Sequence, residues 1–206
     1  MKQQILVIHG GSVSKNYKEY IDFLKTKELR IEKLKGSTAW KDNLGKDLGN
    51  NYEVFVPTMP NRENAKYKEW KIWFERIIPL LNDDLILIGH SLGGIFLAKY
   101  LSTNILPKKI KAVYLVAAPF HDSFHDSFQD PSKGDLANFK LPKSLSKFSN
   151  QVCGIILIQG NDDPLVPNAD VHKYKNKLPN AKLYMFEDKG HFRKEHFPEL
   201  VDMIKT

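Results

Sequence analysis

Six short, continuous apolar runs recur along the chain, and they constrain its fold more than any other feature. Uninterrupted runs of this length are typical of strands covered by helices on both faces of a parallel sheet. Amphipathic segments lie between them, so the sequence predicts an α/β fold: a three-layer sandwich with a mostly parallel sheet of about six strands. The runs are Ile5–Ile8, Val54–Val56, Leu85–Ile88, Ala112–Val116, Ile155–Ile158 and Leu183–Phe186.

The intervening segments carry apolar residues at helical spacing. Residues 67–78 and 197–204 each place large apolar side chains on one side, which predicts amphipathic helices. Residues 92–101 are apolar nearly all round, so we expect a central, buried helix there.

We expect a single domain over residues 1–206, with two departures from simple alternation. Residues 12–36 carry an additional helical pattern, which indicates a helical insertion. Residues 119–150 are too long for an ordinary loop between two strands. Long segments of this kind in compact domains often act as lids or binding loops, so we expect a lid-like segment there.

The lid-like segment contains a tandem His-Asp-Ser-Phe repeat. Phe120, Phe124 and Phe128 recur every four residues, so one helical side would present their rings to an acyl chain. His121 and His125 have the same spacing, which on a helix is also compatible with a metal site. We favour a polar lid and expect no metal.

Composition narrows the possible partners. The net charge is +7, but lysines alternate with acids along much of the chain. Arginine, the residue that reads bases and clamps phosphates, occurs only as Arg30, Arg62, Arg76 and Arg193. We therefore expect a solvated basic surface and no nucleic-acid partner.

The same composition bears on redox chemistry and membranes. The single cysteine, Cys153, excludes an intrachain disulfide framework. No apolar run approaches the ~18 residues that a membrane-spanning helix requires. The first residues do not read as a signal peptide, so we expect a cytoplasmic protein.

The strongest chemical signal is the motif Gly-His-Ser-Leu-Gly at residues 89–93. It follows the run at 85–88 directly and opens the apolar helix, which is the setting of a nucleophile elbow. The glycines allow strand and helix to approach closely, and the helix N-terminus favours a developing oxyanion. The motif therefore predicts Ser91 as a nucleophile.

A serine hydroxyl needs a base to take its proton. His191 comes just after the last strand and follows a glycine that permits a sharp turn, so we predict it as the base rather than any other histidine. The imidazole needs an acid in turn, and Asp162 and Asp163 both follow the run at 155–158. Chain order is the one typical of this arrangement: serine, acid, histidine.

Of the two acids we favour Asp163. Pro164 restricts the preceding residue to an extended backbone, which gives the Asp163 side chain a fixed direction. Asp162 would then point to the other side, where it can hydrogen-bond the turn backbone.

A second glycine motif, His-Gly-Gly-Ser at residues 9–12, follows the first strand directly. A loop in this position can direct a backbone N–H at a reacting oxygen. We expect Leu92 and Gly11 to supply the two N–H groups of an oxyanion hole.

Together these motifs resemble the α/β-hydrolase superfamily. Residues 57–61, Pro-Thr-Met-Pro-Asn, followed by the helix with Trp70, are similar to the small serine hydrolases of the retinoblastoma-binding-protein 9 type. The resemblance implies a minimal α/β-hydrolase fold without the first two strands of larger members. It also implies that Ser91 is the nucleophile, Asp163 the acid and His191 the base.

The predicted function is that of a serine hydrolase, specifically a carboxylesterase. It would cleave carboxylic esters or thioesters of small substrates through an acyl-enzyme, without a cofactor. Peptidase, amidase or lactonase chemistry could use the same residues. The alternative is an α/β-hydrolase-fold module for protein interaction or ligand sensing with little or no turnover.

Overall fold

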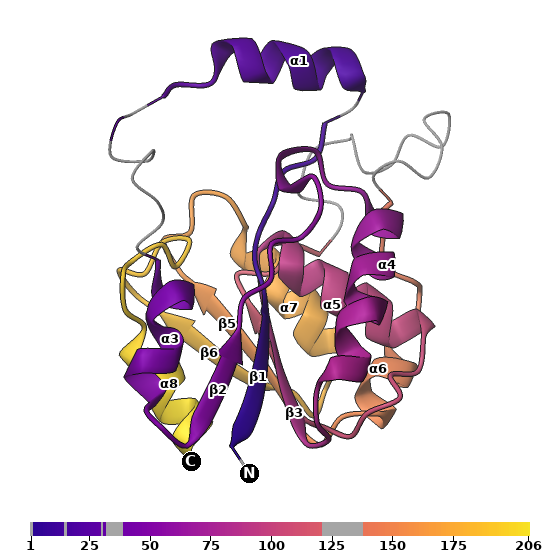
Figure 1. The fold of residues 1–206 in the computed structure, drawn as a ribbon, viewed down its shortest axis with the longest axis vertical. Coiled ribbons are helices and arrows are strands. Elements are labelled where there is room, and N and C mark those ends of the chain that lie inside the picture. Colours follow the sequence, from indigo (N-terminus) through magenta and orange to yellow (C-terminus); the bar gives the residue numbers. More distant parts are fainter. Residues whose placement is uncertain (1, 15, 30, 32–38, 121–137) are drawn as a thin grey trace.

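A six-stranded parallel sheet forms the centre of the computed structural model, which describes residues 2–14, 16–29, 31, 39–120 and 138–206. Its strand order is β2-β1-β3-β4-β5-β6, and every neighbouring pair is parallel (Figure 1). The strands are β1 (Gln3–Ile8), β2 (Tyr52–Phe55), β3 (Leu85–His90), β4 (Ile110–Val116), β5 (Ile155–Gly160) and β6 (Lys182–Phe186). The predicted parallel sheet and all six predicted strands are confirmed.

The strand order reverses once. From β1 the chain first adds β2 on one side, then returns to place β3 on the other side and continues outward to β6. In open parallel sheets, ligands bind outside the carboxyl ends of the strands at such a switch point. Here that point lies between β1 and β3.

Helices cover both faces of the sheet (Figure 1). Helices α3 and α8 pack on one face, and α4, α5, α6 and α7 pack on the other. The bounds are α1 (Tyr17–Thr26), α3 (Trp40–Leu48), α4 (Tyr67–Ile77), α5 (Leu92–Thr103), α6 (Ser146–Asn150), α7 (Asn168–Lys177) and α8 (Pro198–Lys205), with short 3₁₀ turns η1 (Arg62–Asn64) and η2 (Ile78–Leu80).

A hydrophobic core lies on each face of the sheet, and the alternation of side chains along a strand explains how one strand contributes to both. Along β1, Ile5 and Val7 point toward α3 and α8, while Leu6 and Ile8 point toward α4 and α5. All four side chains are completely buried, because helices lie on both sides. Helix α5 is buried along nearly its whole length, as its apolar sequence predicts.

Helix α3 was not predicted. Trp40, Leu44 and Leu48 recur every four residues and are all buried against the sheet. This spacing is a helical signal, but lysines, aspartates and a glycine between these residues obscure it.

The two expected insertions differ in how they attach. Residues 12–36 include α1, none of whose residues is fully buried and which lies apart from the sheet layers in Figure 1. The His-Asp-Ser-Phe repeat, with His121, His125, Phe124 and Phe128, lies outside the described residues. That these two stretches act as an insertion and a lid stays a prediction.

The described flanks of the repeat are anchored in the core. Phe120 packs edge-on against Tyr174 at 4.9 Å between ring centroids, and its N–H donates to the buried Asp170 carboxylate at 2.8 Å. Phe139 and Phe148, on the other flank, are completely buried. The structure thus places Phe120 in the core and not on a lid, because α7 fixes both its ring and its backbone.

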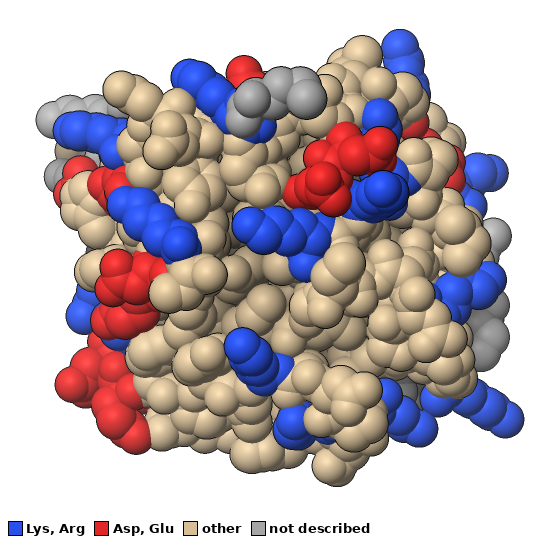
Figure 2. Space-filling view, turned by 90° about the horizontal axis from the view of Figure 1, so that it is seen from below, with Lys and Arg blue, Asp and Glu red and all other residues tan. Residues whose placement is uncertain are grey.

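Figure 2 shows the face at the amino ends of the strands. Lysine and arginine side chains are scattered over a mostly uncharged surface, with acidic side chains in small groups between them. None of the described helices is both long and apolar enough to cross a bilayer.

Candidate active site

Ser91 stands on a strained turn between β3 and α5. Its backbone has φ 54° and ψ −124°, a conformation that side chains other than glycine rarely adopt. The Ser91 N–H donates to the Val116 carbonyl of the neighbouring strand at 2.8 Å, and the Ser91 carbonyl accepts from Gly94 at 2.8 Å. These two bonds hold the serine at the carboxyl end of the sheet.

The turn requires glycine because backbones meet there. A Cβ on Gly93 would lie 2.1 Å from the Ile8 carbonyl oxygen, at the end of β1. A Cβ on Gly89 would lie 2.5 Å from the Gly93 carbonyl oxygen. Any larger residue at either position would push α5 away from the sheet.

His191 and Asp163 form a direct hydrogen bond. His191 Nδ1 donates to Asp163 Oδ2 at 2.8 Å, and the two side chains are 5% and 0% exposed. Asp163 follows β5 and His191 follows β6, so two neighbouring strands bring them to the edge where Ser91 lies. The bond fixes the proton on Nδ1 and leaves Nε2 as an acceptor.

Further donors hold the Asp163 carboxylate in the charged state. Its Oδ1 accepts from the backbone N–H groups of Leu165 at 2.8 Å and Val166 at 3.1 Å. Burial raises the pKa of Asp163, but the hydrogen bonds from His191 and these two N–H groups outweigh it and lower the pKa below its ordinary value. The carboxylate is therefore ionised at neutral pH.

The neighbouring acid, Asp162, forms its hydrogen bond with the backbone of a different loop. Asp162 Oδ1 accepts from the Gly190 N–H at 2.8 Å. It therefore braces the turn that carries His191, and among the described residues it forms no hydrogen bond with the imidazole. The sequence indicated a bond to the turn backbone, and the structure locates that backbone on the adjacent loop.

His90 is the residue that sequence reasoning missed. Its ring is buried, and its centroid lies 4.9 Å from that of His191. His90 Nε2 donates to the His191 carbonyl at 2.9 Å, and Nδ1 accepts from Lys41 Nζ at 3.3 Å. Burial and the positive charge of Lys41 keep the pKa of His90 well below its ordinary value, so the ring is neutral.

The contacts of His90 could not be predicted from the sequence. Alternation along β3 indicates only that its side chain faces the same side of the sheet as α3. Its bonds to His191 and Lys41 join segments that are distant in sequence. No local pattern could have revealed them.

The loop after β1 lies against the serine. A Cβ on Gly10 would lie 3.5 Å from Ser91 Oγ, and one on Gly11 would lie 3.2 Å from Leu92 Cδ2 and 2.6 Å from the Arg62 carbonyl oxygen. The backbone thus approaches Ser91 as closely as glycine allows. The loop could direct an N–H toward an oxygen bound at Ser91.

His9 holds this loop in place. Its Nδ1 donates to the Gly10 carbonyl at 2.6 Å, and its Nε2 accepts from the Met59 N–H at 2.8 Å. Burial lowers the pKa of His9, which keeps the ring in the neutral form that can both donate and accept.

The predicted residues therefore meet at one edge of the sheet. Asp163 and His191 are hydrogen-bonded, while Ser91, Leu92 and Gly11 lie together at the β1–β3 switch point. Ser91 Oγ and His191 make no hydrogen bond to each other among the described residues. Catalytic hydrogen bonds are often longer without substrate and tighten in its presence.

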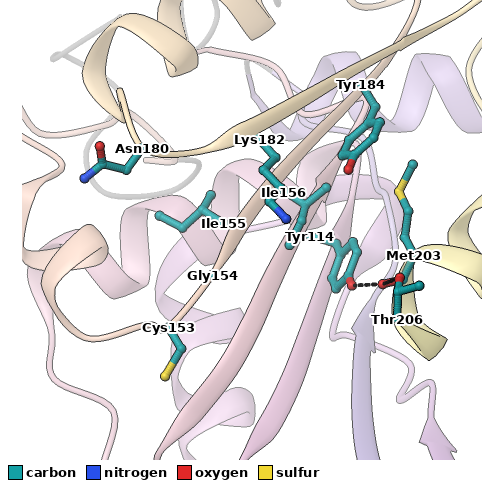
Figure 3. Close-up of a pocket in the computed structure, with 10 residues that line it drawn as sticks. All are labelled: Tyr114, Cys153, Gly154, Ile155, Ile156, Asn180, Lys182, Tyr184, Met203 and Thr206. Atoms are coloured by element: carbon teal, nitrogen blue, oxygen red, sulfur yellow. Dashed lines mark hydrogen bonds between the residues drawn. The ribbon is translucent and has the colours of Figure 1, made fainter.

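A cavity of about 390 Å³ lies elsewhere, at the amino ends of β5 and β6 (Figure 3). Tyr114, Tyr184 and Met203 line it, together with Lys182 and Cys153. It is far from the edge with the buried histidines.

Known proteins are similar to this chain in sequence. A family model described as "Serine hydrolase" matches residues 33–199. The rat serine hydrolase RBBP9 (Rattus norvegicus) is 28% identical over 155 residues, which cover 75% of this chain and 77% of the relative.

Solved structures of low sequence identity share the fold. The ydeN gene product from B. subtilis superposes with a TM-score of 0.69 at 20% identity, covering 99% of this chain and 97% of the other. Naproxen esterase from Bacillus subtilis has a TM-score of 0.62 at 13% identity, covering 99% and 82%. The expected resemblance to small serine hydrolases and the expected α/β-hydrolase fold are confirmed.

Proposed function

The chain belongs to the serine hydrolase family, and we propose that it hydrolyses carboxylic esters or thioesters of small molecules through an acyl-enzyme on Ser91. The observation that carries this proposal is the 2.8 Å bond between His191 and Asp163 at the edge where Ser91 lies. A neutral imidazole with a fixed Nδ1 proton and an available Nε2 is the base that a serine nucleophile needs.

In the first step, Ser91 Oγ attacks the carbonyl carbon and its proton passes to His191 Nε2. The ionised Asp163 stabilises the resulting imidazolium, as its lowered pKa favours. Collapse of the tetrahedral intermediate breaks the bond to the alcohol or thiol, which takes the proton from His191. The acyl group stays on Ser91.

In the second step, water attacks the acyl-enzyme. His191 takes a proton from the water, and the carboxylic acid leaves as Ser91 recovers its proton. In both steps, negative charge develops on the carbonyl oxygen. We assign its stabilisation to the N–H groups of Leu92, at the start of α5, and of Gly11.

Three features support ester cleavage over a binding role. The three side chains that we propose as a triad each follow a strand of one sheet, Ser91 is held in a strained backbone conformation, and Asp163 accepts two backbone hydrogen bonds that favour its charged form. Strain of this kind persists where function requires it. Naproxen esterase, which shares the fold, carries ester cleavage in its name, and we extend that reaction class to this chain.

A fluorophosphonate probe tests the proposal directly, because it reacts only with an activated serine. We expect labelling of the native protein and none of Ser91→Ala. Ser102→Ala is the matched control, since Ser102 lies on the same helix and its hydroxyl donates within it to the Ala98 carbonyl. Absence of labelling in correctly folded native protein would favour an interaction or ligand-sensing module.

A further inference from the structure

The loop that carries His191 is irregular and strained. It spans residues 187–197, all of which the structure describes, and joins β6 to α8 through turns. Asp188, Gly190 and Phe192 have φ of 55°, 50° and 50°, so three of its residues lie in the left-handed region. A loop of this shape keeps one conformation when neighbouring elements hold its backbone groups. Those groups therefore decide where the His191 imidazole stands.

The first residue of helix α3 binds this loop twice. The Trp40 backbone N–H donates to the Lys194 carbonyl at 2.9 Å, and the indole Nε1 donates to the Phe192 carbonyl at 2.9 Å. Trp40 is 1% exposed, and its ring meets that of His90 edge-on at 6.0 Å between centroids. A buried indole N–H without an acceptor is costly, so the second bond fixes the Phe192 carbonyl.

The start of α3 depends on the loop in return. A helix N-terminus leaves N–H groups without partners, which a Ser, Thr, Asp or Asn side chain often caps. Among the described residues, no side chain caps this end of α3, where the cap position holds Ala39. The Lys194 carbonyl accepts from the first N–H of the helix instead. The helix and the loop therefore satisfy each other's backbone groups, and Figure 1 shows the yellow loop beside the upper end of α3.

Two further bonds join the same segments at a greater distance from His191. Asn43 Nδ2 donates to the Glu195 carbonyl at 3.2 Å. His196 Nδ1 donates to Asp47 Oδ2 at 2.8 Å. Trp40, Asn43 and Asp47 are three and four residues apart, so one side of α3 faces the loop.

We infer that Trp40 is a positioning residue for the proposed hydrolysis, because its two bonds hold the loop so that His191 Nε2 faces Ser91. This inference rests on the proposed function and adds a residue to its machinery. His90 already holds the His191 carbonyl, and the Trp40 indole holds the next carbonyl along the chain. The backbone is thus fixed immediately after the imidazole, while Asp163 fixes Nδ1.

The expected consequence is a loss of rate and not of substrate affinity. Proton transfer from Ser91 requires the base at near-contact distance, and a displacement of about 1 Å can cost about 10²-fold in rate. Trp40 is buried behind His90 on the α3 side of the sheet, so it does not contact the substrate directly. A change there should therefore lower kcat and leave KM nearly unchanged.

An isosteric replacement of the indole tests this inference. Site-specific incorporation of β-(3-benzothienyl)alanine in place of Trp40 keeps the bicyclic shape but puts sulfur where the N–H was. The bond to the Phe192 carbonyl is lost, while the packing and the backbone bond to Lys194 remain. We expect kcat for 4-nitrophenyl acetate to fall about five- to tenfold, with KM within about twofold. Trp40→Phe should act in the same direction and more strongly, because it also leaves a cavity.

The rate of labelling by the fluorophosphonate probe is a second readout. That reaction needs Ser91 and its base but no binding of an ester, so its rate constant should fall by the same factor as kcat. Thermal unfolding of each variant separates positioning from stability. The loss of rate should not follow the change in Tm.

Two controls match the replacement. Asp47→Ala cuts a bond between the same helix and the same loop, but at His196, five residues beyond His191. Tyr114→Phe removes a side-chain bond to the Met203 carbonyl in the same core, at the other end of the sheet. Both should keep kcat within about twofold, whatever their effect on Tm.

A benzothienyl variant whose kcat and labelling rate are within twofold of the native values would overturn the inference. An equal loss in Asp47→Ala would also overturn it, because the effect would then not depend on the backbone next to His191. In both cases a native protein that is labelled at Ser91 and cleaves the ester leaves the proposed function intact. A native protein that is neither labelled nor active would overturn both.

Discussion

The two ends of the sheet differ in what they bury. The carboxyl end encloses polar side chains that are each less than a tenth exposed: His9, His90, Ser91 and His191. The amino end has a cavity of about 390 Å³, and the hydrogen bond drawn among its lining residues joins the Tyr114 hydroxyl to the Met203 carbonyl (Figure 3). The surface is hollowed at the amino ends of β5 and β6, whereas the carboxyl end of the sheet buries polar side chains.

Residues with positive φ are also distributed unequally between the two ends of the sheet. Ser91, Ala117 and Asp188 come just after β3, β4 and β6, with φ between 47° and 55°. Phe192, next to His191, has φ 50°. At the amino end, Asp84 before β3 has φ 59°. The carboxyl end therefore holds most of the strained turns, which indicates where function has been maintained against a cost in stability.

The largest expected effect is that of Ser91→Ala. It should reduce kcat for ester hydrolysis by at least ~10³, because it removes the proposed nucleophile, and leave thermal unfolding nearly unchanged. Tyr114→Phe, which removes a hydroxyl at the other end of the sheet, should leave kcat within about twofold. Near-normal turnover by Ser91→Ala would mean that the carboxyl end is not the reactive one.

The next effect separates the two adjacent acids. Asp163→Asn keeps the shape but removes the charge that faces His191, and should reduce kcat by about 10²–10⁴. Asp162→Asn weakens the brace on Gly190 and should cost at most about tenfold. Both are measured with one ester under identical conditions. Greater damage from Asp162→Asn would transfer the acid role to that residue.

A smaller effect is expected at His90, which acts through the backbone of His191. His90→Phe removes the bonds to Lys41 and to the His191 carbonyl, and should lower kcat about tenfold with little change in KM. His90→Gln retains an N–H donor and should recover part of the loss. Equal activity of the two variants would show that the ring serves only packing.

The smallest effect concerns stability and pH. The pKa of Lys41 is about 8 in the folded protein and 10.5 in its ordinary state, so the unfolded chain binds more protons between these values. The free energy of unfolding therefore rises with pH across this window. Lys41→Met should lack this rise, by on the order of 1–3 kcal/mol. Denaturant titrations at pH 7 and pH 10 measure it, and parallel curves for both proteins would contradict it.

Local patterns in the sequence were enough to predict most of the fold. The six apolar runs predicted the parallel sheet, and the apolar stretch at 92–101 predicted the buried helix α5. Ser91, Asp163 and His191 each follow a predicted strand, so one edge had to gather them.

The missed features depend on contacts between distant segments. Lys41 on α3 donates a hydrogen bond to His90 at the end of β3. Asp162, in the loop after β5, accepts one from Gly190 in the loop after β6. The spacing of Trp40 and Leu44 fits a helix, but only the packed structure shows that α3 brings Lys41 to His90. Side-chain partners of this kind follow from tertiary packing and leave no periodic signal.

The contact between Gly93 and the Ile8 carbonyl also has a consequence for folding. The turn at Ser91 is unfavourable by itself and is held only when β1 has docked beside β3, a pairing of segments far apart in the sequence. The reactive arrangement should then form with the global transition and not before it. Amide protons around Ser91 should exchange as slowly as those of the central strands, and activity should vanish in the same denaturant transition as the secondary structure.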